Sequence, residues 1–372
     1  PEIDFIRIGS ELSCDPPFRS RLIENVLEAC STRREVHACI EGCRVFVGTV
    51  ATFSSKTDMF RLKTFDVAIV DEATQILEPQ LLGLLCARDV AGNNAIGKFI
   101  LIGDHKQLPA VVLQSESQSE VCEECLQSIG LYNLKDSLFE RLYRTVSADH
   151  SSPTTQRFYD MLCRQGRMNV EVAQFPNRAF YGGLLEAVGL PHQQGKLVLA
   201  PGLESDEFAD ILVHRVAFLP SVPETPSQSA KINHFEARLT ARLAASDYRQ
   251  CEESNSGFDS ALTLGVITPY RSQIALIKRE IAALGIPVLN DILVDTVERF
   301  QGSERDVIIY SFCVNRTYQL KFLANLTEEK GVWIDRKLNV ALTRARKQLF
   351  MTGVPHLLRQ NPIYADLLDT VL

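Results

Sequence analysis

One octet, at residues 339–346, reads Asn-Val-Ala-Leu-Thr-Arg-Ala-Arg and is followed at residues 348–352 by Gln-Leu-Phe-Met-Thr. The apolar triplet inside the octet predicts a helical turn with Arg344 and Arg346 at its polar end, and the second run predicts a strand. A helix that delivers a guanidinium group to a fixed point beside a sheet suits the neutralisation of a transferring phosphoryl group. For an isolated pair of arginines, the alternative is a solvated basic helix face.

Strand and helix patterns alternate along the rest of the chain, which predicts an α/β fold with parallel sheets. Apolar runs typical of strands lie at 44–50, 65–70, 98–102, 212–218, 261–267, 292–297, 306–312 and 348–352. Patterns typical of helices lie at 77–87, 134–144, 234–245, 271–284 and 335–346.

The length of 372 residues is enough for two domains with their own cores, and we expect them at 1–163 and 164–372. A polar stretch rich in Ser and Glu, at about 114–153, is predicted to be an insertion in the first domain. Clusters of Pro, Ser, Asn and Gly predict loops at 219–230 and 251–259.

The composition excludes several classes of protein. No apolar run is long enough to span a membrane, and the N-terminus lacks the basic and then apolar pattern of a signal peptide. The net charge of −7 means that any contact with nucleic acid must use a local basic strip, because the whole chain repels a polyanion.

The chain has ten cysteines, mostly inside apolar segments, which is typical of buried thiols in a reducing compartment. Examples are Cys86, Cys163 and Cys313. We therefore expect an intracellular protein, cytoplasmic in a bacterium and nuclear or cytoplasmic otherwise. The pairs Cys39 with Cys43 and Cys122 with Cys125 leave a zinc site open, although neither pair has the turn glycines of a zinc knuckle.

Two adjacent acids follow the apolar run Val67–Val70, which is predicted to be a strand buried on both faces. The carboxyl end of such a strand is where α/β sheets bind ligands. Two carboxylates there predict that Asp71 holds Mg²⁺ and that Glu72 orients and deprotonates an attacking water. A helix N-cap pair is the alternative.

Four more stretches carry polar groups next to predicted strands or turns. Gln107 follows the apolar run at 99–102, which is predicted to be a second buried strand, and its neutral side chain can report a γ-phosphate by hydrogen bonding. The other stretches are Gln165–Met168, Gly265–Gln273 and Val294–Asp306.

The octet, the acid pair with its strand and these four stretches make six. In their order along the chain they resemble motifs of the superfamily 1 helicases, in the branch that contains the nonsense-mediated-decay RNA helicase and the replication helicase-nuclease. The resemblance runs from about residue 45 to residue 353. Asp71-Glu72 resembles the Walker B motif, and 103–109 the third helicase motif. Residues 165–168, 296–304 and 339–346 are similar to the fourth, fifth and sixth motifs.

The resemblance implies a motor of two RecA-like parallel-sheet domains, with ATP and Mg²⁺ between them and a single strand of nucleic acid across their tops. It implies that Arg167 and Arg344 approach the γ-phosphate, where an arginine is typically worth about 10³–10⁵ in rate. It also implies that Glu72 and Gln107 act in catalysis. The residues implied to face the nucleotide are Asp71, Gln165, Gly302 and Glu304.

Four residues at predicted strand ends are candidates for contacts with single-stranded DNA or RNA. They are Thr49, Thr268, Tyr270 and Thr296. For each of them an ordinary turn or cap role is the alternative. We expect a monomer with no membrane partner, with further domains of the same polypeptide possible upstream. DNA is mildly preferred over RNA, and the resemblance implies travel from 5′ to 3′.

The phosphate-binding loop of these helicases is missing from the sequence. It needs a strand, a Gly-rich loop ending in Lys-Ser/Thr, and then a helix whose N-terminus faces the phosphates. The nearest match, Gly92–Lys98, precedes Phe99 in place of the hydroxyl and leads into a predicted strand. In the family the loop lies upstream of a segment like 5–10, so we expect a first domain that is incomplete at its N-terminus and little ATP hydrolysis by this chain alone.

A second departure is at Gly166, where the family carries a tyrosine on which adenine stacks. The loss of one such stack is worth about 1–3 kcal/mol, by analogy with nucleic-acid bases, which puts the preference for adenine in doubt.

Two other classes of protein are alternatives to the helicase fragment. The first is a degenerate helicase that binds single strands without turnover, which the missing loop favours. The second is an unrelated P-loop enzyme such as a kinase, which does not account for the second-domain arginines. The intact set of acids and arginines favours the helicase fragment.

Overall fold

The computed structural model describes residues 4–148, 158–224, 229–329 and 331–372. The chain divides into two compact units. Unit 1 takes Pro1–His105 and Pro109–Asp160, and unit 2 takes Lys106–Leu108 and Met161–Leu372. The last part of the expected insertion, 149–153, and residues 225–228 of the expected loop lie outside the described residues.

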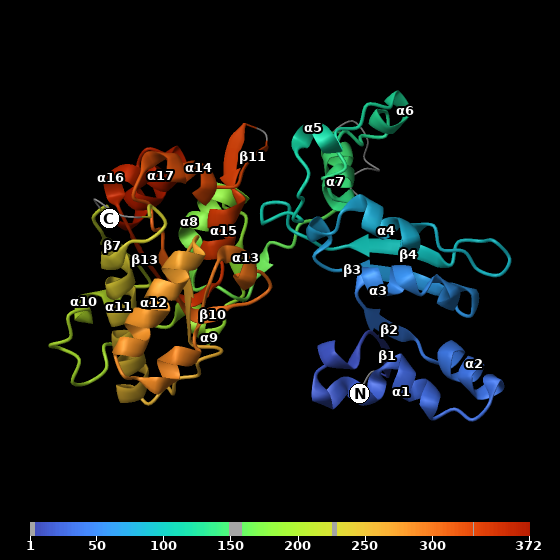
Figure 1. The fold of residues 1–372 in the computed structure, drawn as a ribbon, viewed down its shortest axis with the longest axis horizontal. Helices are drawn as coiled ribbons and strands as arrows, with labels where there is room; N and C mark the ends of the chain where they lie inside the picture. Colours follow the sequence, from blue (N-terminus) through green and yellow to red (C-terminus); the bar gives the residue numbers. More distant parts are fainter. Residues whose placement is uncertain (1–3, 149–157, 225–228, 330) are drawn as a thin grey trace. The chain divides into compact units, whose positions relative to one another are not determined.

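Unit 1 contains two pairs of parallel strands. The first pair is β1 (Phe5–Ile8) with β2 (Val45–Gly48), and the second is β3 (Phe65–Val70) with β4 (Ile96–Leu101). Its helices are α1 (Ile23–Glu28), α2 (Arg33–Gly42), α3 (Val50–Ser55), α4 (Glu78–Leu85), α5 (Glu116–Ser119), α6 (Glu124–Gln127) and α7 (Leu138–Ala148) (Figure 1). The near match to a phosphate loop leads into β4, as expected, and not into a helix.

The expectation that β3 and the next strand are buried on both faces is wrong. Ala68 and Val70 face the core of unit 1, but Val67 is 42% exposed and Ile69 is 66% exposed. Ile100 of β4, which pairs with Ile69 in the parallel register, is exposed as well. Side chains alternate between the two faces of a strand, so Val67, Ile69 and Ile100 share one face of the β3–β4 pair, and that face is open to solvent at these three residues.

Unit 2 is built on a five-stranded parallel sheet in the order β7-β13-β10-β8-β9. Its strands are β7 (Val216–Pro220), β8 (Leu264–Ile267), β9 (Leu293–Asp295), β10 (Arg305–Ser311) and β13 (Ala345–Gly353). Every residue of β8 is buried, which is the continuous apolar pattern of a sheet covered on both faces.

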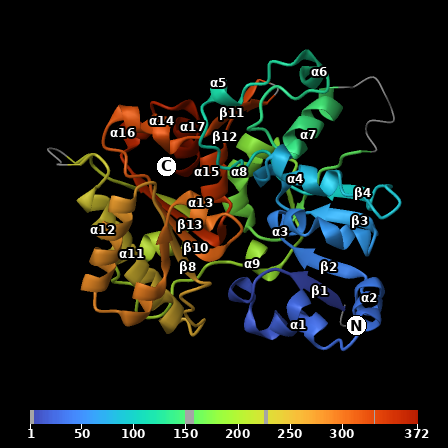
Figure 2. The same ribbon diagram turned by 45° about the vertical axis from the view of Figure 1, so that its right-hand side comes forward.

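Helices cover both faces of this sheet (Figures 1 and 2). One core contains residues of α11 (His234–Glu253) and α12 (Arg271–Ala283). The other contains residues of α8 (Val170–Tyr181), α15 (Arg336–Leu342) and α17 (Pro362–Val371). Shorter elements of unit 2 are α9 (Pro191–Gln194), α10 (Ala209–Leu212), α13 (Val297–Phe300), α14 (Leu320–Leu323) and α16 (Pro355–Leu358).

Two small strand pairs complete unit 2. Strand β5 (Arg164–Gln165) runs parallel to β6 (Glu186–Ala187), and β11 (Leu326–Glu329) forms an antiparallel hairpin with β12 (Val332–Asp335). Neither pair was expected from the sequence.

The helix expected at 335–346 is shorter than the octet suggests. It ends at Leu342, because the Thr343 hydroxyl donates to the Asn339 carbonyl over 2.8 Å and the chain then turns into β13. Arg344 therefore lies in the turn and Arg346 lies in the strand, so the two arginines are not on one helix face.

Two other boundaries differ from expectation. The strand expected at 212–218 begins only at Val216, since residues 209–212 form α10. Helix α11 continues through Glu253, into the loop expected at 251–259. Its buried face extends along the sheet, and tertiary packing of this kind overrides local turn propensity.

A buried carboxylate joins three elements of unit 2. Glu236 on α11 is fully buried and accepts hydrogen bonds from the Ser221 hydroxyl (3.0 Å), the Ser311 hydroxyl (2.7 Å) and the Cys313 amide (2.9 Å). Burial raises the pKa of Glu236 to about 7, although the three hydrogen bonds oppose the rise. Glu236 thereby fixes the residues that follow β7 and β10.

We expect Glu236→Gln to reduce the pH dependence of stability. Because the pKa of Glu236 is higher in the folded chain than its ordinary value of 4.5, its contribution to stability is complete below about pH 4.5 and is lost as the pH rises through about 7. The free energy of unfolding of unit 2, measured by urea titration between pH 5 and pH 8, should fall less steeply with pH in the variant. A slope unchanged from the parent would contradict this assignment. Asp247, whose pKa is also raised to about 7 by burial, keeps part of the slope in both proteins.

Candidate functional site

The two acids of unit 1 lie at the carboxyl end of β3, as the sequence predicts. Both are exposed, and Glu72 has a left-handed backbone with φ of 50°, which is uncommon for a residue other than glycine. The Glu72 amide donates to Asp71 Oδ1 over 2.9 Å, and Gln75 Nε2 donates to Glu72 Oε2 over 2.7 Å. The Ala73 amide donates to the Ile102 carbonyl over 2.8 Å, so the acids and the residues after β4 lie at the same sheet edge.

The N-cap alternative for this pair is not what the structure has. Glu72 does precede a short 3₁₀ helix, Ala73–Gln75, but its side chain makes no capping hydrogen bond to that helix. Asp71 offers an exposed carboxylate at a strand end, and carboxylate oxygens are ligands that Mg²⁺ takes.

Arg344 is the most buried charged group of the candidate site in unit 2, with 2% of its surface exposed. Its Nη2 donates to Gln107 Oε1 (3.1 Å) and to the Thr343 hydroxyl (3.3 Å). Its Nε donates to the Val340 carbonyl (3.2 Å), and its Nη1 donates to the Ser303 carbonyl (3.4 Å). The sixth motif and Gln107 of the third are therefore in direct contact, although 237 positions separate them.

Arg167 joins the same group of residues through Glu304. Its Nε donates to Glu304 Oε2 over 2.7 Å, and its Nη1 donates to the Thr343 carbonyl over 3.4 Å. The other oxygen of Glu304 lies 3.4 Å from Arg346 Nε. These ion pairs are partly exposed, so they orient the side chains more than they stabilise the fold.

The chain turns sharply just before Glu304. Gly302 has φ of 77°, a conformation that favours glycine, and the next residue, Ser303, supplies a carbonyl to Arg344. Gly302, Glu304, Arg167, Arg344 and Gln107 are thus gathered in unit 2.

The side chain of Gln165 organises its own loop. Its Oε1 accepts from the Met168 amide (2.8 Å), and its Nε2 donates to the Met168 carbonyl (2.9 Å). Gln193 Nε2 donates to the Gln165 carbonyl over 2.9 Å. These bonds fix the backbone on both sides of Arg167, and this structural role was missed in the sequence, where only a nucleotide contact was expected.

Three of the four strand-contact candidates lie in unit 2, after β8 and β9. Thr268 is fully buried, and its hydroxyl has no hydrogen-bond partner in the described part of the chain. Its amide donates to the Asp295 carbonyl over 3.1 Å, next to Thr296. Tyr270 is partly buried, and its hydroxyl accepts from Gln319 Nε2 over 3.1 Å.

The fourth candidate, Thr49, lies in unit 1 and caps α3. Its hydroxyl oxygen accepts from the Thr52 amide over 3.2 Å. The alternative cap role is therefore present at Thr49, while the position of the side chain in the exposed first turn leaves it accessible.

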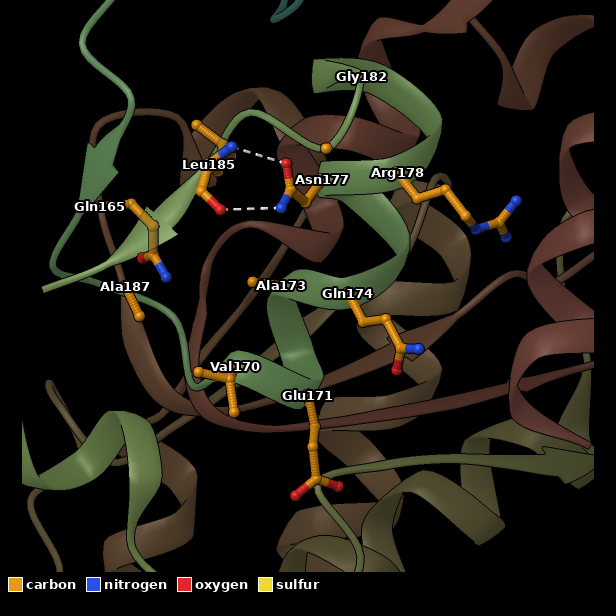
Figure 3. Close-up of a pocket in the computed structure, with 11 residues that line it drawn as sticks. Gln165, Val170, Glu171, Ala173, Gln174, Asn177, Arg178, Gly182, Leu185 and Ala187 are labelled. Carbon is orange, nitrogen blue, oxygen red and sulfur yellow. Dashed lines mark hydrogen bonds between the residues drawn. The ribbon is translucent and has the colours of Figure 1, made fainter. Parts of the chain in front are cut away.

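A hollow of about 680 Å³ lies beside Gln165, between α8 and the residues around β6 (Figure 3). Its walls carry amides, aliphatic side chains and two charged groups, and Asn177 closes one side with two 2.9 Å hydrogen bonds to the backbone of Leu185. The lining residues are Gln165, Val170, Glu171, Ala173, Gln174, Asn177, Arg178, Gly182, Gly183, Leu185 and Ala187. Neither Arg167 nor Arg344 lines it, so the hollow is separate from the arginine group.

All ten cysteines are free thiols, but Cys86 is exposed where burial was expected and Cys163 is only partly buried. Cys122 and Cys125 are exposed as well. Within the described residues, no three His, Cys, Asp or Glu side chains gather in a way that could hold a metal ion. No helix in that part of the chain is long and apolar enough to cross a bilayer.

Parallel α/β units, an acid pair at a strand end and a group of arginines beside a glutamine are features that P-loop nucleoside triphosphatases share. Two family models, each described as an AAA domain, match residues 134–356 and 20–115. The chain belongs to the superfamily 1 helicases, in the group of the replication helicase-nuclease.

The curated relatives carry helicase names. The chain is 29% identical over 355 residues to an uncharacterized ATP-dependent helicase of Methanocaldococcus jannaschii, covering 94% of this chain and 44% of the relative. It is 29% identical over 391 residues to the DNA replication ATP-dependent helicase/nuclease DNA2 of Mus musculus, covering 99% and 32%. The protein of the same name from Xenopus laevis is 30% identical over 380 residues, covering 96% and 31%. The chain thus spans less than half of each of these relatives.

Solved structures that match include the PRRSV helicase, at 12% identity and a TM-score of 0.33, covering 84% of this chain and 38% of that one. The arterivirus nonstructural protein 10 helicase matches at 13% identity and a TM-score of 0.32, covering 83% and 42%.

We expect Arg344→Lys to destabilise unit 2 by about 1–3 kcal/mol, because a lysine cannot satisfy the four buried acceptors that the guanidinium group reaches. The free energy of unfolding can be measured in urea from the fluorescence of Trp333, which lies in unit 2 and is the chain's only tryptophan. Arg346→Lys is the matched control, since Arg346 is more exposed and its ion pairs are worth about 0–1 kcal/mol. An equal loss in both variants would contradict the special role of Arg344.

Proposed function

We propose that this chain carries most of the ATP-hydrolysing core of a helicase that moves along single-stranded nucleic acid. The observation that carries the proposal is the contact between Arg344 and Gln107, with Arg167 and Glu304 beside it. Two arginine side chains can neutralise the charge on a transferring γ-phosphoryl group, and the neutral amide of Gln107 can hydrogen-bond to that group.

In this proposal Glu72 orients and deprotonates the attacking water, and Arg167 and Arg344 neutralise the developing charge. Asp71 is the residue that would hold Mg²⁺, which would supply positive charge to offset that of the phosphates. Gly302 and Glu304 would lie near the nucleotide, where Glu304 keeps Arg167 in place through the 2.7 Å ion pair.

The proposed strand contacts are Thr49, Tyr270 and Thr296, with Thr268 acting through the backbone turn that it shares with Asp295. DNA is the preferred strand, supported by the name of the replication helicase-nuclease among the relatives. By the same resemblance, the proposed direction of travel is 5′ to 3′, and the proposed location is intracellular.

A degenerate helicase that binds strands without turnover is the second candidate, and one observation favours it. The sequence has no Gly-rich loop followed by Lys-Ser/Thr and a helix, so the chain itself supplies no cradle for the β- and γ-phosphates. The hydrogen bond of the buried Arg344 guanidinium group to Gln107 supports the motor instead, because strand binding alone does not require it.

We expect this chain alone to hydrolyse Mg²⁺-ATP no faster than Glu72→Gln, with or without single-stranded DNA or RNA, because the phosphate cradle is missing. Steady-state phosphate release measures this. ATP hydrolysis that single-stranded DNA or RNA stimulates and that Glu72→Gln abolishes would contradict the inference that the phosphate-binding loop is missing.

The same preparation should bind labelled oligothymidylate in fluorescence anisotropy, with an affinity that falls as salt rises. Absence of strand binding at low salt would overturn both candidate functions. If Mg²⁺-ATP changes the strand affinity and Arg344→Ala removes that change, the motor is supported. An affinity that nucleotide leaves unchanged fits either candidate, because the chain supplies no cradle for the phosphates.

We expect Gly166→Tyr to raise the affinity for adenine nucleotides over other nucleoside triphosphates. A Cβ at this position would meet only Leu190 (3.6 Å) and Val188 (3.7 Å) at ordinary contact distances, so a side chain can start from residue 166 without a clash at Cβ. A gained stack of about 1–3 kcal/mol corresponds to about 5- to 150-fold. Competition of ATP and uridine triphosphate against a fluorescent nucleotide measures the preference, with Gly166→Ala as the control that adds no ring. Equal gains for both nucleotides would contradict base stacking at residue 166.

A further inference from the structure

The hairpin β11–β12 reaches the loop that carries Gln107. Glu329, at the end of β11, places Oε2 3.3 Å from Lys106 Nζ, and the two side chains are only 20% and 18% exposed. The same ammonium group donates to the Phe180 carbonyl over 2.9 Å and lies 5.7 Å from the ring centre of Tyr181. Lys106 is thereby attached both to the hairpin and to the end of α8.

The backbone on each side of Gln107 is held as well. The Lys106 carbonyl accepts from Asn339 Nδ2 over 2.8 Å, and the Leu108 carbonyl accepts from Gln301 Nε2 over 3.3 Å. The Leu108 side chain is buried in the core of unit 2. Gln107, between these two anchors, presents Oε1 to Arg344.

An ion pair that is four-fifths buried responds strongly to the loss of one partner. Removal of either charge takes from the other the ion pair that offsets its desolvation, which costs more than the pair itself contributes. Loss of the Glu329 carboxylate should therefore loosen the Lys106 side chain, and with it one end of the Gln107 loop.

We infer that Lys106 and Glu329 are positioning residues, which together fix Gln107 against Arg344 and link this contact to the β11–β12 hairpin. The value of that position for catalysis rests on the proposed function; the link itself does not. When Arg344 exchanges its bond to Gln107 for another acceptor, the 106–108 loop is held by one bond fewer. The resulting movement of this loop is passed through Lys106 to Glu329 on the hairpin.

The hairpin contains a tryptophan whose fluorescence can report on its conformation. Trp333 on β12 is 55% exposed and is the chain's only tryptophan. It pairs across the hairpin with Glu328, while Glu329 pairs with Val332. A change in the hairpin should therefore alter the emission of Trp333 and its quenching by acrylamide.

The test compares Lys106→Glu, Glu329→Lys and the double variant that exchanges the two charges. Hydrogen exchange of the amides of 106–108, followed by mass spectrometry, should rise by about tenfold in each single variant and return to within about twofold of the parent in the double variant. Glu328→Lys is the matched control, because it makes the same charge change one residue away and should leave the exchange of 106–108 unaltered. Unchanged exchange in the single variants, or no recovery in the double variant, would overturn the positioning role.

The link to Arg344 is tested without nucleotide, by Arg344→Lys. This variant should raise exchange in 106–108 and also shift the Trp333 signal, whereas Arg346→Lys should do neither. Faster loop exchange with an unchanged Trp333 signal would refute the link to the hairpin. Because no arm needs ATP or a strand, a chain that fails to bind either would refute the proposed function and leave this result standing.

Discussion

The buried guanidinium group of Arg344 is the interaction on which the candidate site depends. A charge with 2% of its surface exposed is tolerated only when acceptors surround it, and here they come from Gln107, Ser303, Val340 and Thr343. Each acceptor belongs to a different part of unit 2 or to the turn of Arg344 itself. The demand for these bonds therefore brings the third, fifth and sixth motifs into one place.

Around Arg344, some side chains hold neighbouring loops and side chains in place, and others are left to contact a ligand. Gln165 and Gln193 are bonded to the backbone of the loop that carries Arg167, so they hold that loop in shape. Glu304 lies between Arg167 and Arg346, with one carboxylate oxygen near each cation. Lys106 serves the same purpose for Gln107, since its ammonium group is bound to α8 and to the hairpin.

The two units differ in how completely their sheets are covered. In unit 2, helices pack on both faces of five parallel strands, and every residue of β8 is buried. In unit 1, Ile69 and Ile100 are exposed on one face of the β3–β4 pair.

The sequence by itself determined the α/β class, the parallel strands and the positions of Asp71, Glu72 and Gln107 after apolar strands, because hydrophobic periodicity and motif order are local properties of the chain. It misplaced the end of the helix before Arg344 and missed the β11–β12 hairpin and the bonds of Gln165 to the backbone of Met168. Only the tertiary structure decided these, along with the exposed face of β3 and the contact of Gln107 with Arg344. Burial and hydrogen-bond partners depend on residues hundreds of positions apart, and no local pattern encodes which distant acceptor a buried donor will find.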